Sequence, residues 1–190
     1  AALAAKERRL SDSGDPRGAQ LMELAEERGS LTGELHKIHE ARHAADQADR
    51  ALAEVEEKLG SASSWSTYDT FLSGGMVSGW MKHSRLDEAA EAAARAEDHM
   101  AALRTELADV EDAELLAQHL SVDAMTKFMD VWVDNFFADL AVHDRIKKAQ
   151  EGVTQAQALV RDVREMLDRR EGEARARLEQ LDEQRRRLLT

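Results

Sequence analysis

Leucine, alanine and valine recur at alternating steps of three and four residues along most of this 190-residue chain. With this spacing an α-helix presents one narrow apolar face to a neighbouring helix, and the pattern constrains the fold more than any other feature of the sequence. The composition agrees, because 34% of the residues are charged and only 4% are aromatic, as is typical of coiled coils and long helices. We therefore predict an all-α fold, an elongated antiparallel helical hairpin extended to a three-helix coiled coil.

Caps and breaks predict where the helices begin and end. Asp15 followed by Pro16 is typical of a helix N-terminus, Gly60 is expected to end that helix, and Ser121 is a second candidate N-cap. The chain then forms a single elongated helical domain, 1–190, with helices at 16–59, 84–118 and 121–190 and an aromatic, glycine-rich cap at 60–83. The apolar rows of the three helices are Leu24, Leu31, Leu35, Ile38, Ala41, Ala45, Ala48, Leu52, Val55 and Leu59; Leu86, Ala89, Ala93, Ala96, Met100, Leu103, Leu107 and Val110; and Val153, Val160, Val163, Leu167, Leu178 and Leu181.

The alanine patches of the first two rows predict a register for the hairpin. Pairing Ala45 with Ala93 sets small residues against small ones and Leu52 against Leu86, so that the helices approach closely. A short turn would then return the third helix parallel to the first. Its last ~30 residues, ~45 Å of helix at 1.5 Å per residue, would lack an internal partner. Such an overhang predicts self-association, because an isolated helix is marginal in water.

All eight aromatic residues lie in two islands, 65–80 and 128–137. The first is interpreted either as a hydrophobic plug that closes the hairpin or as an exposed patch for a protein partner. The second is apolar over more of its circumference than a two-helix contact needs, which predicts burial in a thicker bundle or a dimer. The residues expected to carry an interaction are Trp65, Tyr68, Asp69, Phe71, Trp80, Lys82, His83, Trp132, Phe136 and Phe137.

The same register brings histidines and carboxylates of three helices to one level. Imidazole and carboxylate groups from facing helices are the ligands by which bundles hold zinc, iron or manganese, and Glu40 and His43 have the Glu-x-x-His spacing of such sites. A second Glu-x-x-His and two further glutamates are missing, so a pH-sensitive polar layer and a chance alignment stay open beside the metal site. The proposed ligands are His39, Glu40, His43, His99, Asp139 and His143.

The charge distribution bears on the kind of partner. The net charge of −12 arises in Leu86 to Asp144, where fifteen acidic residues face three basic ones. No basic face suited to nucleic acid is evident. The chain has no cysteine, and no apolar run approaches the ~20 residues of a membrane span. We expect a cytoplasmic protein whose partner is protein, with a homo-oligomer as the first possibility.

Four groups of residues carry a resemblance. Trp65-x-Thr67-x-Asp69, then Gly74-Gly75, then the run 82–87 (Lys-His-Ser-x-Leu-Asp), followed by acidic residues around the second island, resemble a set of uncharacterised bacterial helical proteins. No activity follows from this resemblance. The sequence favours a non-enzymatic coiled-coil scaffold or protein-interaction module; the alternatives are a metal-binding helical bundle and a membrane-surface stress-response rod.

Overall fold

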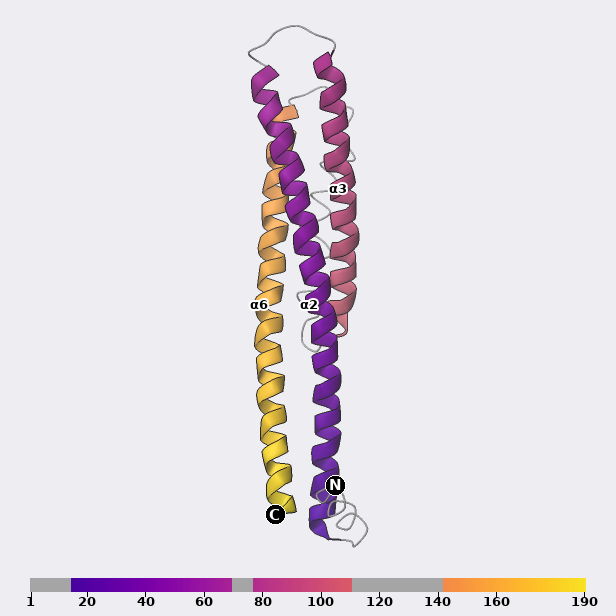
Figure 1. Ribbon diagram of the computed structural model, residues 1–190, viewed down its shortest axis with the longest axis vertical. Coiled ribbons are helices and arrows are strands. Elements are labelled where there is room, and N and C mark those ends of the chain that lie inside the picture. The colour runs from indigo at the N-terminus through magenta and orange to yellow at the C-terminus, as the bar shows by residue number, and fades with distance from the viewer. Residues whose placement is uncertain (1–14, 70–76, 111–141) are drawn as a thin grey trace. The chain divides into compact units, whose positions relative to one another are not determined.

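The computed structural model describes residues 15–69, 77–110 and 142–190. These residues form three α-helices and no β-strand: α2 (Pro16–Asp69), α3 (Val77–Ala108) and α6 (Val142–Leu189) (Figure 1). The predicted all-α class is confirmed.

The N-terminus of α2 is capped as the sequence predicts. The Arg17 backbone N–H donates to Asp15 Oδ1 at 2.9 Å, and the Gly18 N–H donates to the Asp15 carbonyl oxygen at 2.8 Å. Pro16 lacks an N–H, which costs nothing at the first helical position. The Arg17 side chain also donates to the Asp15 carboxylate, and this hydrogen bond lowers the pKa of Asp15.

The predicted end of this helix at Gly60 is wrong. α2 continues through Gly60 to Asp69, because a glycine in a helix interior costs only ~1 kcal/mol relative to alanine. The predicted cap at 60–83 is therefore not a separate element. Its first part ends α2, its last part begins α3 at Val77 rather than at residue 84, and residues 70–76 lie outside the described residues.

The other predicted boundaries also shift. α3 ends at Ala108, and α6 is described from Val142. The predicted continuation of the second helix to residue 118 and the predicted start of the third helix after Ser121 lie outside the described residues. The chain separates into two compact units, Glu40–Glu165 and the combination of Ala1–His39 with Met166–Thr190. We call their described parts the three-helix segment and the two-helix segment.

The three-helix segment has an apolar core to which all three helices contribute, with alanines beside larger residues. Within this segment the predicted row positions whose side chains are described are buried, and Ile146, Ala149 and Ala156 extend the row of α6. The buried residues are Ala41, Ala44, Ala45, Ala48, Ala51, Leu52, Val55 and Leu59 of α2; Ala89, Ala92, Ala93, Ala96, Met100, Leu103 and Leu107 of α3, with Val110 after it; and Ile146, Ala149, Val153, Ala156, Val160 and Val163 of α6.

Two ion pairs fix how α2 and α3 meet. Lys58 Nζ lies 3.0 Å from Glu88 Oε2, and Arg95 Nη2 lies 2.6 Å from Glu54 Oε1. The later residue of α2 pairs with the earlier residue of α3, so the two helices are antiparallel, as predicted. The predicted register is wrong, however, because it places Ser84 opposite Glu54, where the structure has Arg95. The shift is about ten residues, or ~15 Å along the helix.

The observed register pairs small residues with large ones. It sets Leu52 level with Ala96, and Ala45 level with Leu103, instead of alanine level with alanine. A large side chain opposite a small one fills the space between two helices at uniform density, whereas two opposed alanines leave a gap beside opposed leucines. Packing by complementary volume therefore replaces the predicted match of equal sizes.

The predicted parallel orientation of the third helix is also wrong. In the three-helix segment Gln157 Nε2 donates to Glu56 at 2.9 Å, while Arg164, later in α6, contacts the earlier Asp49 at 3.2 Å. In the two-helix segment Arg177 pairs with Glu27 at 2.6 Å, while the earlier Arg170 of α6 pairs with the later Glu34 of α2 at 3.4 Å. α6 is thus antiparallel to α2 in each segment, and the predicted overhang is paired with α2. A row of apolar residues at threes and fours reads the same in both directions, so it could not decide this orientation.

Candidate interaction surface

The two-helix segment buries its apolar residues less completely than the three-helix segment. Leu21 and Leu189 are buried together, with Leu188 partly buried against them. Ala174 and Leu181 of α6 are buried as well. Ile38 and Leu167 are fully buried too. Four other leucines at the spacing of the row keep part of their surface in solvent, namely Leu24, Leu31, Leu35 and Leu178. Two helices can cover only one side of each other, so the outer part of each such leucine stays uncovered.

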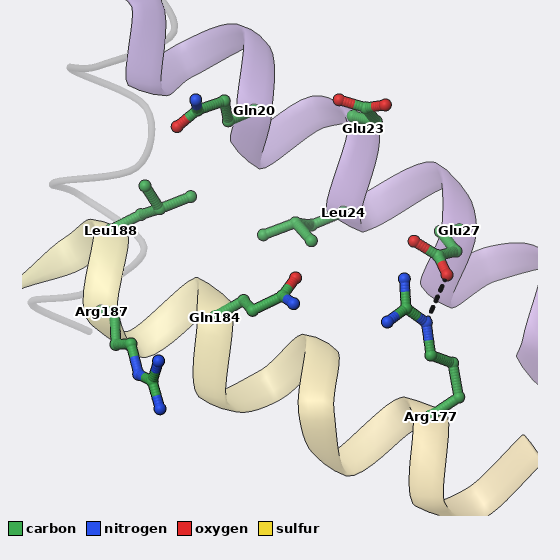
Figure 2. Close-up of a pocket in the computed structure, with 8 residues that line it drawn as sticks. All are labelled: Gln20, Glu23, Leu24, Glu27, Arg177, Gln184, Arg187 and Leu188. Atoms are coloured by element: carbon green, nitrogen blue, oxygen red, sulfur yellow. Dashed lines mark hydrogen bonds and ion pairs between the residues drawn. The ribbon is translucent and has the colours of Figure 1, made fainter.

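A groove lies between α2 and α6 in this segment, with a volume of about 460 Å³. Figure 2 shows Leu24 and Leu188 projecting from the two helices into the space between them. The lining residues are Gln20, Glu23, Leu24 and Glu27 of α2 and Gln184, Arg177, Arg187 and Leu188 of α6. The groove therefore has an apolar floor with polar and charged walls.

The charges of the two walls differ in sign. Arg177 Nε donates to Glu27 Oε1 at 2.6 Å across the groove (Figure 2), and this hydrogen bond raises the pKa of Arg177. Seven residues after Glu27 on α2 and seven residues before Arg177 on α6, Arg170 Nη1 donates to Glu34 Oε1 at 3.4 Å. The wall from α2 is acidic and the wall from α6 is basic. We call them the acidic wall and the basic wall.

A second set of contacts, none of whose residues lines the groove, has the reverse polarity. Arg28 of α2 lies 3.6 Å from Asp182 of α6, and His39 of α2 lies 3.1 Å from Glu171 of α6. Charged residues beside the apolar row select the orientation and the partner of coiled-coil helices. This pattern accounts for the antiparallel pairing of α2 and α6 here.

Glu171 is the one buried charged residue among those that the structure describes, at 6% exposure. It lies between the buried Leu167 and Ala174, where the row calls for an apolar side chain. His39 Nε2 is 3.1 Å from its Oε1, and Arg175 forms an ion pair with the same oxygen. A buried carboxylate is tolerated when charged or polar donors offset its desolvation. Sequence reasoning missed this residue, although a glutamate four residues after Leu167 in an apolar row was a visible signal.

The structure does not assemble the predicted metal layer. The residues that it describes contain no group of three or more His, Cys, Asp or Glu side chains that could hold a metal ion. His39 contacts Glu171, and His43 contacts Gln47 at 2.9 Å. Glu56 of α2 contacts Gln157 of α6, so these two residues mark the same level of the antiparallel helices. His43 lies on one side of that level, and His143 lies on the other side. The two backbones are on the order of 40 Å apart at 1.5 Å per residue.

The remaining proposed metal ligands come from different parts of the chain. Glu40 stands in α2 and His99 in α3, and Asp139 lies outside the described residues. The observed register of α2 and α3 sets His99 level with about Asp49, so the alignment that suggested the layer is lost.

The predicted aromatic patch is distributed over two helices. Trp65, Tyr68 and Asp69 belong to the last turns of α2, and Trp80, Lys82 and His83 to the first turns of α3. Phe71 lies outside the described residues, as do Trp132, Phe136 and Phe137 of the second island. The role of these residues stays a prediction.

No helix among the described residues is long and apolar enough to cross a membrane. Comparison with known proteins gives no match: no family model, no curated protein and no solved structure is similar to this chain. The site can therefore be interpreted only from its own chemistry.

Proposed function

We propose that this protein is a non-enzymatic coiled-coil scaffold that binds another protein chain through its two-helix segment. The observation that carries the proposal is the partial exposure of leucines that stand at the spacing of a helix-packing row, Leu24 and Leu31 above all. In the three-helix segment the corresponding positions are covered by a further helix. The two-helix segment leaves room for a helix in the same place.

Energy and charge both favour such a contact. Full burial of a leucine side chain stabilises by ~1.5–3 kcal/mol, so covering several half-buried leucines can drive association. The acidic and basic walls beside them supply the selectivity that a purely apolar surface lacks. Several arginines of α6 meet carboxylates in ion pairs, as Arg164, Arg170 and Arg177 do. This pairing favours a protein partner over an anionic membrane surface.

Site-specific photo-crosslinking tests the proposal. A photoreactive amino acid replaces Gln20, which lines the groove, or Glu26, which is exposed on α2 and does not line it. We expect a discrete protein adduct of the full-length chain in cells at Gln20 and none at Glu26. A second requirement makes the result specific: the adduct must disappear when Leu24→Glu is added and must persist with Met22→Glu.

Met22 is a suitable control because it is a large apolar residue of the same helix, 59% exposed, outside the groove. Equal adducts at Gln20 and Glu26, or an adduct that survives Leu24→Glu, would contradict the proposed function.

A further inference from the structure

We propose that the groove binds the same groove of a second copy of this chain, with the two chains parallel, so that the two-helix segments form a four-helix bundle. This inference rests on the proposed function and names its partner. The argument starts from the charges of the two walls. Glu23 and Glu27 stand on α2, and Arg177 and Arg187 stand on α6.

Symmetry allows two ways for the groove to meet itself face to face. A two-fold axis perpendicular to the helices sets α2 against α2 of the second copy, and like charges then oppose each other. A two-fold axis along the helices sets α2 against α6 of the second copy, so each acidic wall faces a basic wall. Charge complementarity selects the second arrangement.

The selected arrangement also satisfies helix packing. α2 and α6 are antiparallel within one chain, and with parallel chains every helix is antiparallel to both of its neighbours. This is the arrangement of an antiparallel four-helix bundle. Leu24 and Leu188 of both copies would meet at its centre, where they become fully covered.

Glu23 adds a group suited to this contact. It is exposed, lines the groove, and forms no ion pair or hydrogen bond with another residue in the described part of the chain. On the opposite wall Arg187 pairs with Glu183 one turn earlier in its own helix, and one guanidinium can contact two carboxylates. In the proposed dimer, Glu23 of each copy faces the second copy's Arg187.

The first experiment measures self-association of the full-length chain by sedimentation equilibrium. We expect a dimer for the unmodified chain, a monomer for Leu24→Glu, and a dimer for the matched control Met22→Glu. Circular dichroism of each variant establishes that the helices remain. A monomeric unmodified chain, or a dimer that persists in folded Leu24→Glu, overturns the inference.

Charge reversal then tests the parallel arrangement. Glu23→Arg and Arg187→Glu each place like charges at two sites of a homodimer, and we expect each to weaken dimerisation by ~10-fold. Mixing the two variants restores opposite charges at both sites in the heterodimer, so dimerisation should return. Mixing Glu23→Arg with the unmodified chain leaves one repulsive site and should not restore it. If Glu23→Arg instead pairs with the unmodified chain more tightly than the unmodified chain pairs with itself, α2 faces α2 and the parallel arrangement is wrong.

These outcomes separate the inference from the proposed function. A chain that stays monomeric, yet gives a Leu24-dependent adduct with a different protein at Gln20, retains the proposed function and overturns the self-pairing. An adduct within a single chain, from residues 1–14 for example, would also overturn it. Absence of any Leu24-dependent adduct together with a monomer would remove both.

Discussion

The two-helix and three-helix segments use the same two helices, yet they bury them differently. Leu24 of α2 is a large residue that stays partly exposed in the two-helix segment, whereas Ala45 of the same helix is 0% exposed in the three-helix segment. The size and apolarity of a residue therefore do not decide its burial here. In the two-helix segment Leu21, Leu167 and Leu181 are buried against the neighbouring helix, while Leu24 at the edge of that contact is not. A third helix can close the edge that one neighbour leaves open.

The segments also differ in what interrupts the apolar row. In the described three-helix segment every buried position is apolar, but the two-helix segment contains Glu171. A fully apolar row stabilises, while a buried carboxylate costs desolvation and is best attested as a device that fixes register. The comparison predicts that the apolar row contributes more to stability in the three-helix segment than in the two-helix segment.

The largest expected effect comes from truncating the core. Leu103 is 0% exposed in the three-helix segment, and Leu103→Ala should lower the free energy of unfolding by ~3 kcal/mol, because it removes buried surface and leaves a cavity. Leu24→Ala in the two-helix segment should cost ~1 kcal/mol, since part of that side chain is already hydrated. Urea unfolding of both variants measures the difference. Equal losses would break the comparison.

Replacing the buried carboxylate should have a smaller effect of opposite sign. Glu171→Leu continues the row between Leu167 and Ala174, and we expect it to raise the free energy of unfolding by ~1 kcal/mol, because the desolvation cost is removed. Glu173→Leu, at an exposed position two residues away, should change it little. Urea unfolding measures both, and a loss of stability in Glu171→Leu would show that its contacts with His39 and Arg175 outweigh desolvation.

The smallest expected effects are those of pH, and they have opposite directions in the two segments. In the two-helix segment hydrogen bonds from Arg17 and Arg187 lower the pKa values of Asp15 and Glu183. A carboxylate with a lowered folded pKa contributes stability that is complete above its unfolded pKa, about 4, and that is lost as the pH falls through the folded value. The ends of this segment should therefore fray in acid.

In the three-helix segment the hydrogen bond to Glu88 raises the pKa of Lys58. Its contribution is complete below the unfolded pKa, about 10.4, and is lost as the pH rises through the folded value. Backbone amide resonances by NMR can follow both ends of the range. The Arg17 amide should shift in acid, and this shift should vanish in Asp15→Asn, which retains a capping side chain without a titrating group. An acid shift that persists in that variant would contradict the assignment to Asp15.

Local signals predicted local features well. The pair Asp15 and Pro16 predicted the start of α2, because a capping oxygen and a missing N–H act within one turn. The row positions predicted in the three-helix segment are buried, from Ala41 to Leu59 in α2 for example, whereas Leu24, Leu31, Leu35 and Leu178 of the predicted rows stay partly exposed. Gly60 misled because its preference of ~1 kcal/mol is smaller than the stabilisation from a continued helix.

Features that depend on two helices were not predictable in this way. The pairing of Glu54 with Arg95, and the contact of His39 with Glu171, each depend on a register and a direction that neither helix specifies alone. The expected metal layer failed for the same reason, since it required two registers to be correct together.

The sequence by itself determined that this chain is helical, where α2 begins, and which face of each helix is apolar, because caps and periodicity act between residues that are near one another in the chain. Only the tertiary structure decided that α6 is antiparallel to α2, that alanine lies level with leucine, and that Leu24 and Leu188 border a groove with oppositely charged walls. Heptad rows are compatible with several directions and registers. Complementary side-chain volumes and ion pairs between distant residues select one of them.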